Sequence, residues 1–179
     1  MTAARRSARR KRRTPPTHPG RKRQAVTPNR AKQTAAAARP PRLPAEYARL
    51  VRAAGRARRR AYAPYSQFPV GAAVLANDGT IYAGCNVENA SYGLALCAER
   101  VAIHTAVANG RRRLTALAVV GPAGITLTPC GACRQVMEEF GLQTVIIAAP
   151  RGAPAVVSLP ALLPIPFTGG WAQPRHASL

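Results

Sequence analysis

Three of the four cysteines in this chain of 179 residues stand in two short groups, and this spacing constrains the fold more than any other feature. Cys97 is followed two residues later by Glu99, while Cys130 and Cys133 are three residues apart. Both groups fall at the expected start of a helix. Because residues three apart lie on one face of a helix, the thiols of Cys130 and Cys133 can converge on a single ion, with Cys97 as a third ligand. The fold must therefore bring two distant helix starts together.

Three sulfur ligands predict a catalytic metal site. Clustered cysteines in a reducing compartment are more often metal ligands or catalytic groups than disulfides. A tetrahedral zinc ion with three protein ligands keeps one position open, which a water molecule can occupy. Glu99 is about 200° from Cys97 around a regular helix, but at a helix terminus that faces the ion both side chains can reach it. Glu99 is thus expected to handle the proton of the zinc-bound water without being a ligand.

The charge of such a site requires a nearby cation. Zinc with three thiolates has a net charge of about −1, and ionisation of the bound water would make it about −2. Arg100 directly follows Glu99, and Arg134 directly follows Cys133. Either arginine can donate charge-assisted hydrogen bonds to sulfur and reduce this penalty.

The formal charge of +21 is concentrated at the N-terminus. Residues 1–43 contain 14 of the 27 Lys and Arg and none of the 6 Asp and Glu, which leaves +7 for residues 44–179. Residues 1–42 have too little apolar surface to offset the entropy of ordering, so we expect a disordered basic tail followed by one folded domain over residues 43–179. A solvated charge run is favoured over a nucleic-acid-binding arm because no aromatic residues interleave with the charges.

Two further hypotheses for the tail are a targeting peptide for organelle import and a translation start assigned too far upstream. The chain has no apolar run of the roughly 20 residues that a membrane-spanning helix needs, and its N-terminus lacks the apolar stretch of a secretory signal. We therefore expect a cytoplasmic protein without a membrane partner.

Hydrophobic periodicity predicts an α/β fold after the tail. An Asp-Gly turn within residues 77–79 indicates a β-hairpin, and the strands that follow are almost continuously apolar, as strands buried on both faces tend to be. The expected order is helix 44–60, strands 70–76 and 80–85, helix 97–109, strand 114–120, helix 130–140, strand 144–149, a short strand 155–157 and a Pro-interrupted segment 159–166. This order predicts a mixed sheet with helices on both faces.

Four motifs stand in order along the chain, and they are AYAPYSQFPVGAA (61–73), GCNVENAS (84–91), CAER (97–100) and PCGACRQ (129–135). Together they resemble the small homotetrameric cytidine deaminases, and the likeness covers about Leu43 to Phe167. The Cys-x-Glu and Pro-Cys-x-x-Cys pair is the general signature of zinc deaminases. The resemblance implies a three-layer α/β/α fold with a mixed five-stranded sheet, and a hydrolase that deaminates cytidine and deoxycytidine in pyrimidine salvage.

The resemblance also implies roles at the metal. Cys97, Cys130 and Cys133 would bind one zinc ion per chain. Glu99 would carry a proton from the zinc-bound water to ring atom N3 and then assist departure of the amino group. Arg100 would donate hydrogen bonds to the thiolates.

Further positions match the family's substrate site. Asn86 and Glu88 correspond to the pair that binds the ribose hydroxyls, and Phe68 corresponds to an aromatic wall of the base pocket. Ala98 is also assigned to substrate binding. Phe167 resembles a phenylalanine that reaches the base pocket of a neighbouring subunit.

Several alternatives compete with this interpretation. Cys130 and Cys133 can be a redox pair, and Cys85 can complete a closed four-cysteine zinc site. The enzyme can act on a base within RNA or DNA, although such deaminases usually carry His at the position of Cys97, or on a nucleoside drug of the blasticidin type. A zinc-stabilised nucleic-acid-binding protein is the non-enzymatic hypothesis.

Overall fold

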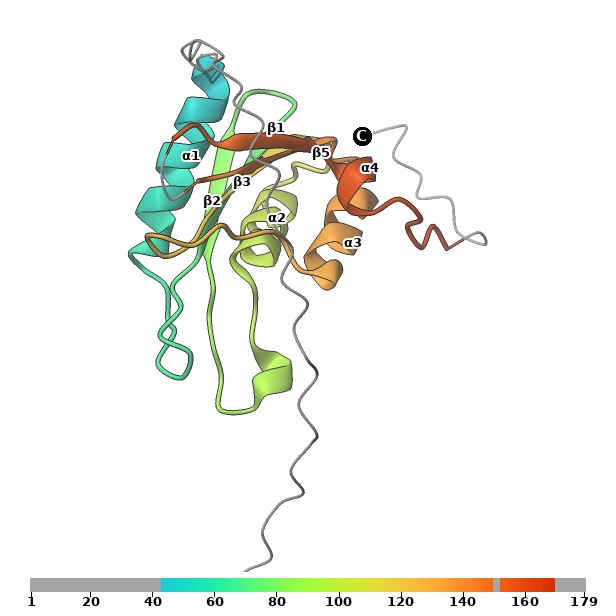
Figure 1. Ribbon diagram of the computed structural model, residues 1–179. Coiled ribbons are helices and arrows are strands. Elements are labelled where there is room, and N and C mark those ends of the chain that lie inside the picture. The colour runs from blue at the N-terminus through green and yellow to red at the C-terminus, as the bar shows by residue number, and fades with distance from the viewer. Residues whose placement is uncertain (1–42, 150–151, 170–179) are drawn as a thin grey trace, which may run out of the picture. The chain divides into compact units, whose positions relative to one another are not determined.

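The structure is a computed structural model that describes residues 43–149 and 152–169, so the predicted basic tail lies outside the described residues. The elements follow the predicted order, with one short 3₁₀ helix that the periodicity did not predict (Figure 1). They are α1 (Ala45–Arg58), β1 (Gly71–Ala76), β2 (Ile81–Cys85), η1 (Tyr92–Leu94), α2 (Ala98–Ala108), β3 (Leu114–Val120), α3 (Gly131–Glu139), β4 (Thr144–Ile147), β5 (Ala155–Ser158) and α4 (Leu159–Leu162).

One mixed sheet of five strands organises the described residues, in the order β2-β1-β3-β4-β5. β1 pairs with β2 and with β3 in antiparallel fashion, β3 and β4 are parallel, and β5 is antiparallel to β4. The β1–β2 hairpin closes through Gly79, whose φ of 84° is readily adopted by glycine, as the Asp-Gly signal predicted. The parallel pair requires a crossover, which α3 provides.

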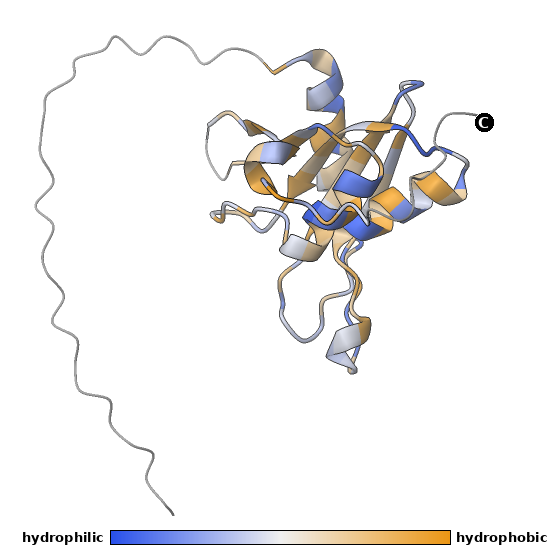
Figure 2. Ribbon diagram, turned by 90° about the vertical axis from the view of Figure 1, so that its right-hand side faces the viewer, coloured by the Kyte–Doolittle hydropathy of each residue, from blue (hydrophilic) through white to orange (hydrophobic). Residues whose placement is uncertain are grey.

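Alternate residues of the central strands face opposite layers, because side chains in a strand alternate between its two faces. Ala73 and Leu75 of β1 pack with α1, whereas Ala72 and Val74 pack with the helices on the other face. The views in Figures 1 and 2 show α1 on one side of the sheet, α2 and α3 on the other, and largely apolar strands between them. The predicted α/β/α architecture is confirmed.

None of the helices in the described part of the chain combines the length and apolar character that crossing a membrane requires.

Glycine allows α1 to pack closely on β1. A Cβ atom at Gly71 would lie 2.1 Å from the Ala54 carbonyl oxygen and 2.4 Å from the Arg58 nitrogen. Both neighbours are backbone atoms within a helix, so neither can move without displacing α1.

We therefore expect Gly71→Ala to lower the free energy of unfolding by about 1–3 kcal/mol, the usual cost of overpacking. Gly55→Ala is the matched control, because Gly55 lies within α1 and its added Cβ would meet nothing within 4 Å. The control is expected to raise stability by about 0.5–1 kcal/mol through helix propensity. Urea denaturation at one protein concentration measures both. An unchanged midpoint for Gly71→Ala would contradict the close approach.

Candidate metal centre and substrate site

The starts of α2 and α3 bring three cysteines together on the face of the sheet opposite α1. Cys97 is the N-cap residue of α2, and Cys130 is the N-cap residue of α3, with Cys133 buried one turn into that helix. The Cys97 and Cys130 sulfurs are 3.9 Å apart, and the Cys130 and Cys133 sulfurs are 3.5 Å apart. All three sulfurs lie within 4.8 Å of one another.

This group fits one zinc ion per chain. Ligands of a tetrahedral zinc ion at about 2.3 Å would place their sulfurs roughly 3.8 Å apart, close to the separations observed. Three thiolates also match the preference of zinc for sulfur donors. Cys85 contacts the Arg60 carbonyl oxygen through its sulfur at 3.4 Å and does not belong to the group, so the closed four-cysteine arrangement is not formed.

Glu99 lies in the first turn of α2 and is only 4% exposed. Burial raises the pKa of its carboxyl above the usual value, and the negative charge of Cys97 adds to this rise. Hydrogen bonding to Cys133 and the charge of Arg100 oppose it. A buried carboxyl with a raised pKa, beside the cysteine sulfurs but outside the ligand group, is suited to accept and release a proton.

The thiols of Cys97 and Cys133 have different pKa values in the metal-free protein. A hydrogen bond from the Cys133 thiol, with further hydrogen bonds from Arg100 and Cys130, lowers the pKa of Cys97 to about 5. The same hydrogen bond to Cys97 retains the proton on Cys133, and burial adds to the effect, so the pKa of Cys133 is raised. Cys97 is therefore a thiolate ready to bind a cation.

Of the two arginines considered from the sequence, Arg100 is the one that contacts sulfur. Its Nη2 atom donates to Cys97 Sγ at 3.9 Å and to the Ala95 carbonyl oxygen at 3.0 Å, and its buried Nε atom has no partner. Arg134 instead donates to the carbonyl oxygens of Pro129 and Leu162. Arg100 supplies the positive charge at the cysteines, whereas Arg134 ties α3 to the loop before it and to α4.

Asn86 connects the end of β2 to the loop that carries Phe68. Its Oδ1 atom accepts a hydrogen bond from the Val70 backbone at 2.7 Å, and its Nδ2 atom donates to the Phe68 carbonyl oxygen at 3.0 Å. One N–H of the amide remains for another acceptor. The predicted substrate residues Asn86 and Phe68 thus lie in one hydrogen-bonded unit. Gln67 directly precedes Phe68 and adopts an uncommon φ of 54°.

Glu88 lies in the same unit and lines an open recess of about 380 Å³. Its carboxylate accepts hydrogen bonds from the backbone nitrogens of Tyr65 and Ser66 and from the Ser66 hydroxyl. The Ser66 hydroxyl and these backbone donors lower the pKa of Glu88, which favours the ionised form. Tyr65 and Tyr92 also line the recess, with their rings edge to face and 6.0 Å between centroids.

The sequence interpretation missed this pair of tyrosines. Tyr65 is 50% exposed, and Tyr92 is 77% exposed in η1. The signal lay within the motifs themselves, since Tyr92 directly follows the 84–91 motif and Tyr65 stands in the motif that contains Phe68.

The remaining predicted substrate residues occupy different environments. Ala98 is fully buried between Cys97 and Glu99 at the start of α2. Phe167 follows α4 and is 67% exposed. Gln135 of α3 holds the backbone of Phe167 from both sides, with its amide donating to the carbonyl oxygen at 2.7 Å and accepting from the nitrogen at 3.0 Å. The contact of Phe167 with a neighbouring subunit stays a prediction.

Comparison with known proteins agrees with this geometry. Residues 44–149 match the family model of the cytidine and deoxycytidylate deaminase zinc-binding region. The chain is 48% identical over 122 residues to a cytidine deaminase of Sporosarcina psychrophila, an alignment that covers 67% of this chain and 90% of that relative.

Solved structures extend the comparison. A cytidine deaminase from Burkholderia pseudomallei superimposes with a TM-score of 0.64 and 51% identity, covering 68% of this chain and 98% of that one. A cytidine deaminase from Mycobacterium tuberculosis gives a TM-score of 0.59 and 46% identity, with coverage of 68% and 96%. Fold and sulfur cluster together define a zinc-binding deaminase domain. The chain belongs to the cytidine and deoxycytidylate deaminase family.

The role of Arg100 predicts how Cys97 titrates in folded, metal-free protein. Because the pKa of Cys97 is lowered to about 5, its thiolate persists at neutral pH and is lost as the pH falls through that value. We expect Arg100→Gln to raise this midpoint, since a hydrogen bond and a positive charge are removed. The pH dependence of Cys97 alkylation, followed by peptide mass spectrometry, measures it.

Arg134→Gln is the matched control for this titration. The hydrogen bonds that the Arg134 side chain donates go to backbone carbonyl oxygens and not to sulfur. Its replacement should therefore leave the Cys97 midpoint unchanged. Equal midpoints in the Arg100→Gln variant and the native chain would show that the arginine does not stabilise the thiolate.

Proposed function

We propose that this chain is a zinc-dependent cytidine deaminase, which hydrolyses cytidine and deoxycytidine to uridine and deoxyuridine with release of ammonia. The observation that carries the proposal is the group of three cysteine sulfurs with the buried carboxyl of Glu99 beside it. The 48% identity to a cytidine deaminase across 90% of its length supports the same activity.

The reaction replaces the amino group on ring carbon C4 with an oxygen from water. Cys97, Cys130 and Cys133 would hold the zinc ion, which when bound supplies a Lewis acid that makes water acidic enough to attack near neutral pH. Glu99 accepts a proton from the attacking water and delivers it to ring atom N3. It then assists proton transfer to the departing amino group, which leaves as ammonia.

The environment of Glu99 fits this shuttle. Its raised pKa allows the carboxyl to hold a proton between the two transfers, while Arg100 offsets the negative charge of the sulfurs. Ala98, between the metal ligand Cys97 and the proton carrier Glu99 in sequence, is fully buried. The N-termini of α2 and α3 also bring the partial positive charge of their backbone N–H groups close to the three cysteine sulfurs.

Ribose recognition in this proposal rests on Asn86 and Glu88. The ionised carboxylate of Glu88 accepts hydrogen bonds, and the remaining amide N–H of Asn86 can donate one. Both match the hydroxyl groups of a free sugar. Phe68, whose carbonyl oxygen bonds to Asn86, forms the aromatic wall against the base.

The proposal includes a homotetramer. Exposed apolar residues on the segment between β2 and α2, and on the chain after α4, support an assembly in which neighbouring copies cover them. Phe167, held by Gln135, is then available to a neighbouring base pocket. These exposed side chains are Val87, Tyr92, Leu94, Leu96, Ile165 and Phe167.

In the cell, this activity would recover pyrimidines in the cytoplasm, with the catalytic domain spanning residues 43–179. The residues around the cysteine group that the structure describes do not favour the alternatives of a base within RNA or DNA or a blasticidin-type drug. The redox hypothesis for Cys130 and Cys133 is also unsupported, because Cys97 joins them in a metal-type group.

Glu99→Gln separates chemistry from metal binding. Removing the proton carrier is expected to lower kcat for cytidine on the order of a thousandfold, because general acid–base catalysis contributes about that much. Zinc content should remain near one ion per chain, since Glu99 is not a ligand. Ultraviolet absorbance follows turnover, and elemental analysis follows zinc.

Glu139→Gln is the control for the same chemical change on the exposed surface of α3, and its turnover should equal that of the native chain. Substrate scope is read from parallel assays with deoxycytidine, adenosine and a short cytosine-containing oligonucleotide. Loss of zinc from the Glu99→Gln variant, or preferential turnover of the oligonucleotide, would refute the assigned roles.

A further inference from the structure

A second feature lies along the β2 edge of the sheet, mainly on the α1 side, and reaches Val101 of α2. α1 and the edge strand β2 border an open groove of about 980 Å³. Five arginines line it, and none of its lining residues is acidic. They are Arg49, Arg52, Arg56, Arg59 and Arg60. We call these residues the arginine row.

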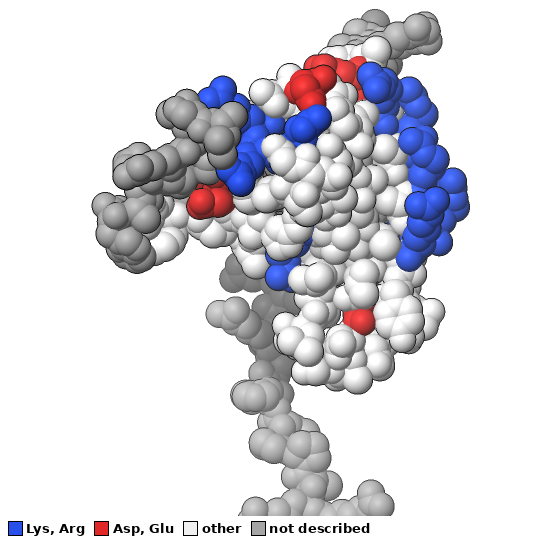
Figure 3. Space-filling view, turned by 180° about the vertical axis from the view of Figure 1, so that it is seen from behind, with Lys and Arg blue, Asp and Glu red and all other residues white. Residues whose placement is uncertain are grey.

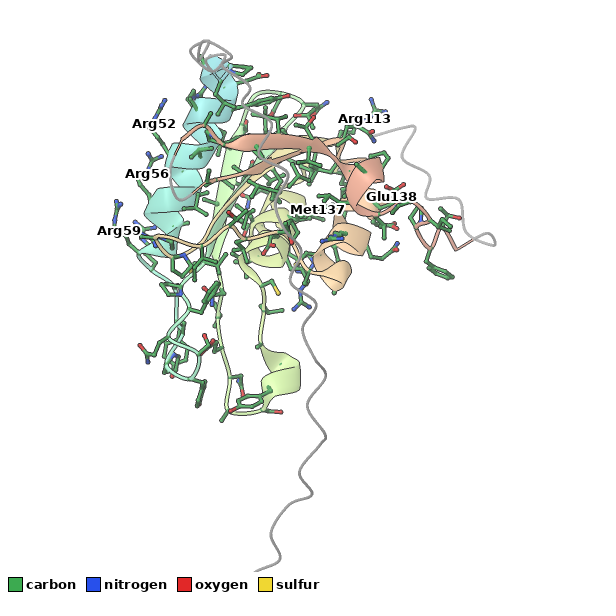
Figure 4. All side chains as sticks on the ribbon, in the orientation of Figure 1. Arg52, Arg56, Arg59, Arg113, Met137 and Glu138 are labelled. Carbon is green, nitrogen blue, oxygen red and sulfur yellow. The ribbon has the colours of Figure 1, made fainter. Side chains whose placement is uncertain are left out.

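The arginine row follows the helix geometry of α1 and its C-terminal turn. Spacings of three or four residues place the side chains on one face. Figure 4 shows Arg52, Arg56 and Arg59 arranged along α1 and pointing outward, and Figure 3 shows basic side chains gathered in a column over this helix. At about 1.5 Å per residue, the row from Arg49 to Arg59 is roughly 15 Å long.

The charges of the row are not balanced within the described residues. All five arginines are exposed, and none forms a side-chain hydrogen bond or ion pair there. Asp78, next to the groove residue Gly79, is paired with Arg111 at 2.6 Å. Like charges three or four residues apart on a helix destabilise it. A row of this kind is better explained by an anionic partner than by the stability of α1.

The length and chemistry of the groove favour a polymer with regularly spaced phosphates. One phosphate group contacts one or two guanidinium groups, so a small anion would leave most of the row without a partner. A nucleic-acid duplex carries about one charge per 1.7 Å of its axis and can engage the whole row. Among the strands that the structure describes, β2 lies at the edge of the sheet, so one side of it presents backbone groups that none of them pairs.

The residues of the groove distinguish between macromolecules. No aromatic side chain lines it, so it lacks the stacking platforms that bind single strands and the aromatic anchors typical of protein interfaces. We propose that the arginine row binds the phosphate backbone of double-stranded nucleic acid without reading its sequence.

This binding is independent of deamination. The groove touches α2 at Val101, but Arg52 and Arg56 lie on α1, which packs on the opposite face of the sheet from Cys97, Glu99 and α3. Variants in the row are therefore expected to keep their cytidine turnover. Failure of the binding proposal would leave the deaminase assignment intact, and the reverse also holds.

Fluorescence anisotropy with the full-length, zinc-loaded chain tests the proposal, using duplex RNA and duplex DNA of one sequence over a range of salt concentrations. The variant combines Arg52→Gln with Arg56→Gln. The matched control combines Arg112→Gln with Arg113→Gln, which removes the same charge from exposed positions just before β3. Figure 4 shows Arg113 far from the labelled arginines of α1.

The row variant is expected to bind both duplexes on the order of tenfold more weakly, and the slope of log affinity against log salt should fall by about 2. The control should retain affinity and slope. Equal losses of affinity in the two variants would show that binding responds to net charge alone. An unchanged affinity of the row variant would show that the arginine row is not the binding site. Tighter binding of a single strand, equal competition by inorganic triphosphate, or preferential binding to phosphatidylserine vesicles would each overturn the proposed partner.

Discussion

The meeting of two helix starts at three sulfur atoms is the constraint on which this site depends. Cys97 caps α2 and Cys130 caps α3, although 33 residues separate them, and Cys133 follows in the first turn of α3. The β3 strand and the crossover through α3 bring these starts together. A zinc ion would join the helices directly, so folding and metal binding are expected to be coupled.

Electrostatics then sets the roles of the neighbouring residues. Three thiolates would be costly to hold close together without a cation, and Arg100 lies against Cys97 for this reason. Glu99 is buried beside the sulfurs, which raises its pKa and suits it to carry a proton rather than to bind metal. Arg134, equally near in sequence, serves the backbone instead. Each arginine directly follows a site residue in sequence. Their hydrogen-bond partners differ because the two helices direct the side chains differently.

The sequence was sufficient to predict most of the fold and the clustering of the three cysteines. Strand alternation and the Asp-Gly turn predicted the hairpin, and the cysteine spacing predicted the cluster, because both are local patterns with a direct geometric meaning. The contacts of Asn86 with Phe68 and Val70 join segments 16 and 18 residues apart, which no periodicity encodes. The arginine row is visible in α1 as helical spacing, but its groove exists only once β2 lies beside the helix.

Zinc-edge X-ray absorption spectroscopy of the full-length protein tests the central claim most directly. The account predicts about one zinc ion per chain, with three sulfur neighbours near 2.3 Å and one oxygen or nitrogen neighbour near 2.0–2.2 Å. The light neighbour would mark the open position at which water is activated. A shell of four sulfurs, or a zinc ion that survives replacement of Cys97 by Ala with its sulfur count unchanged, would contradict it.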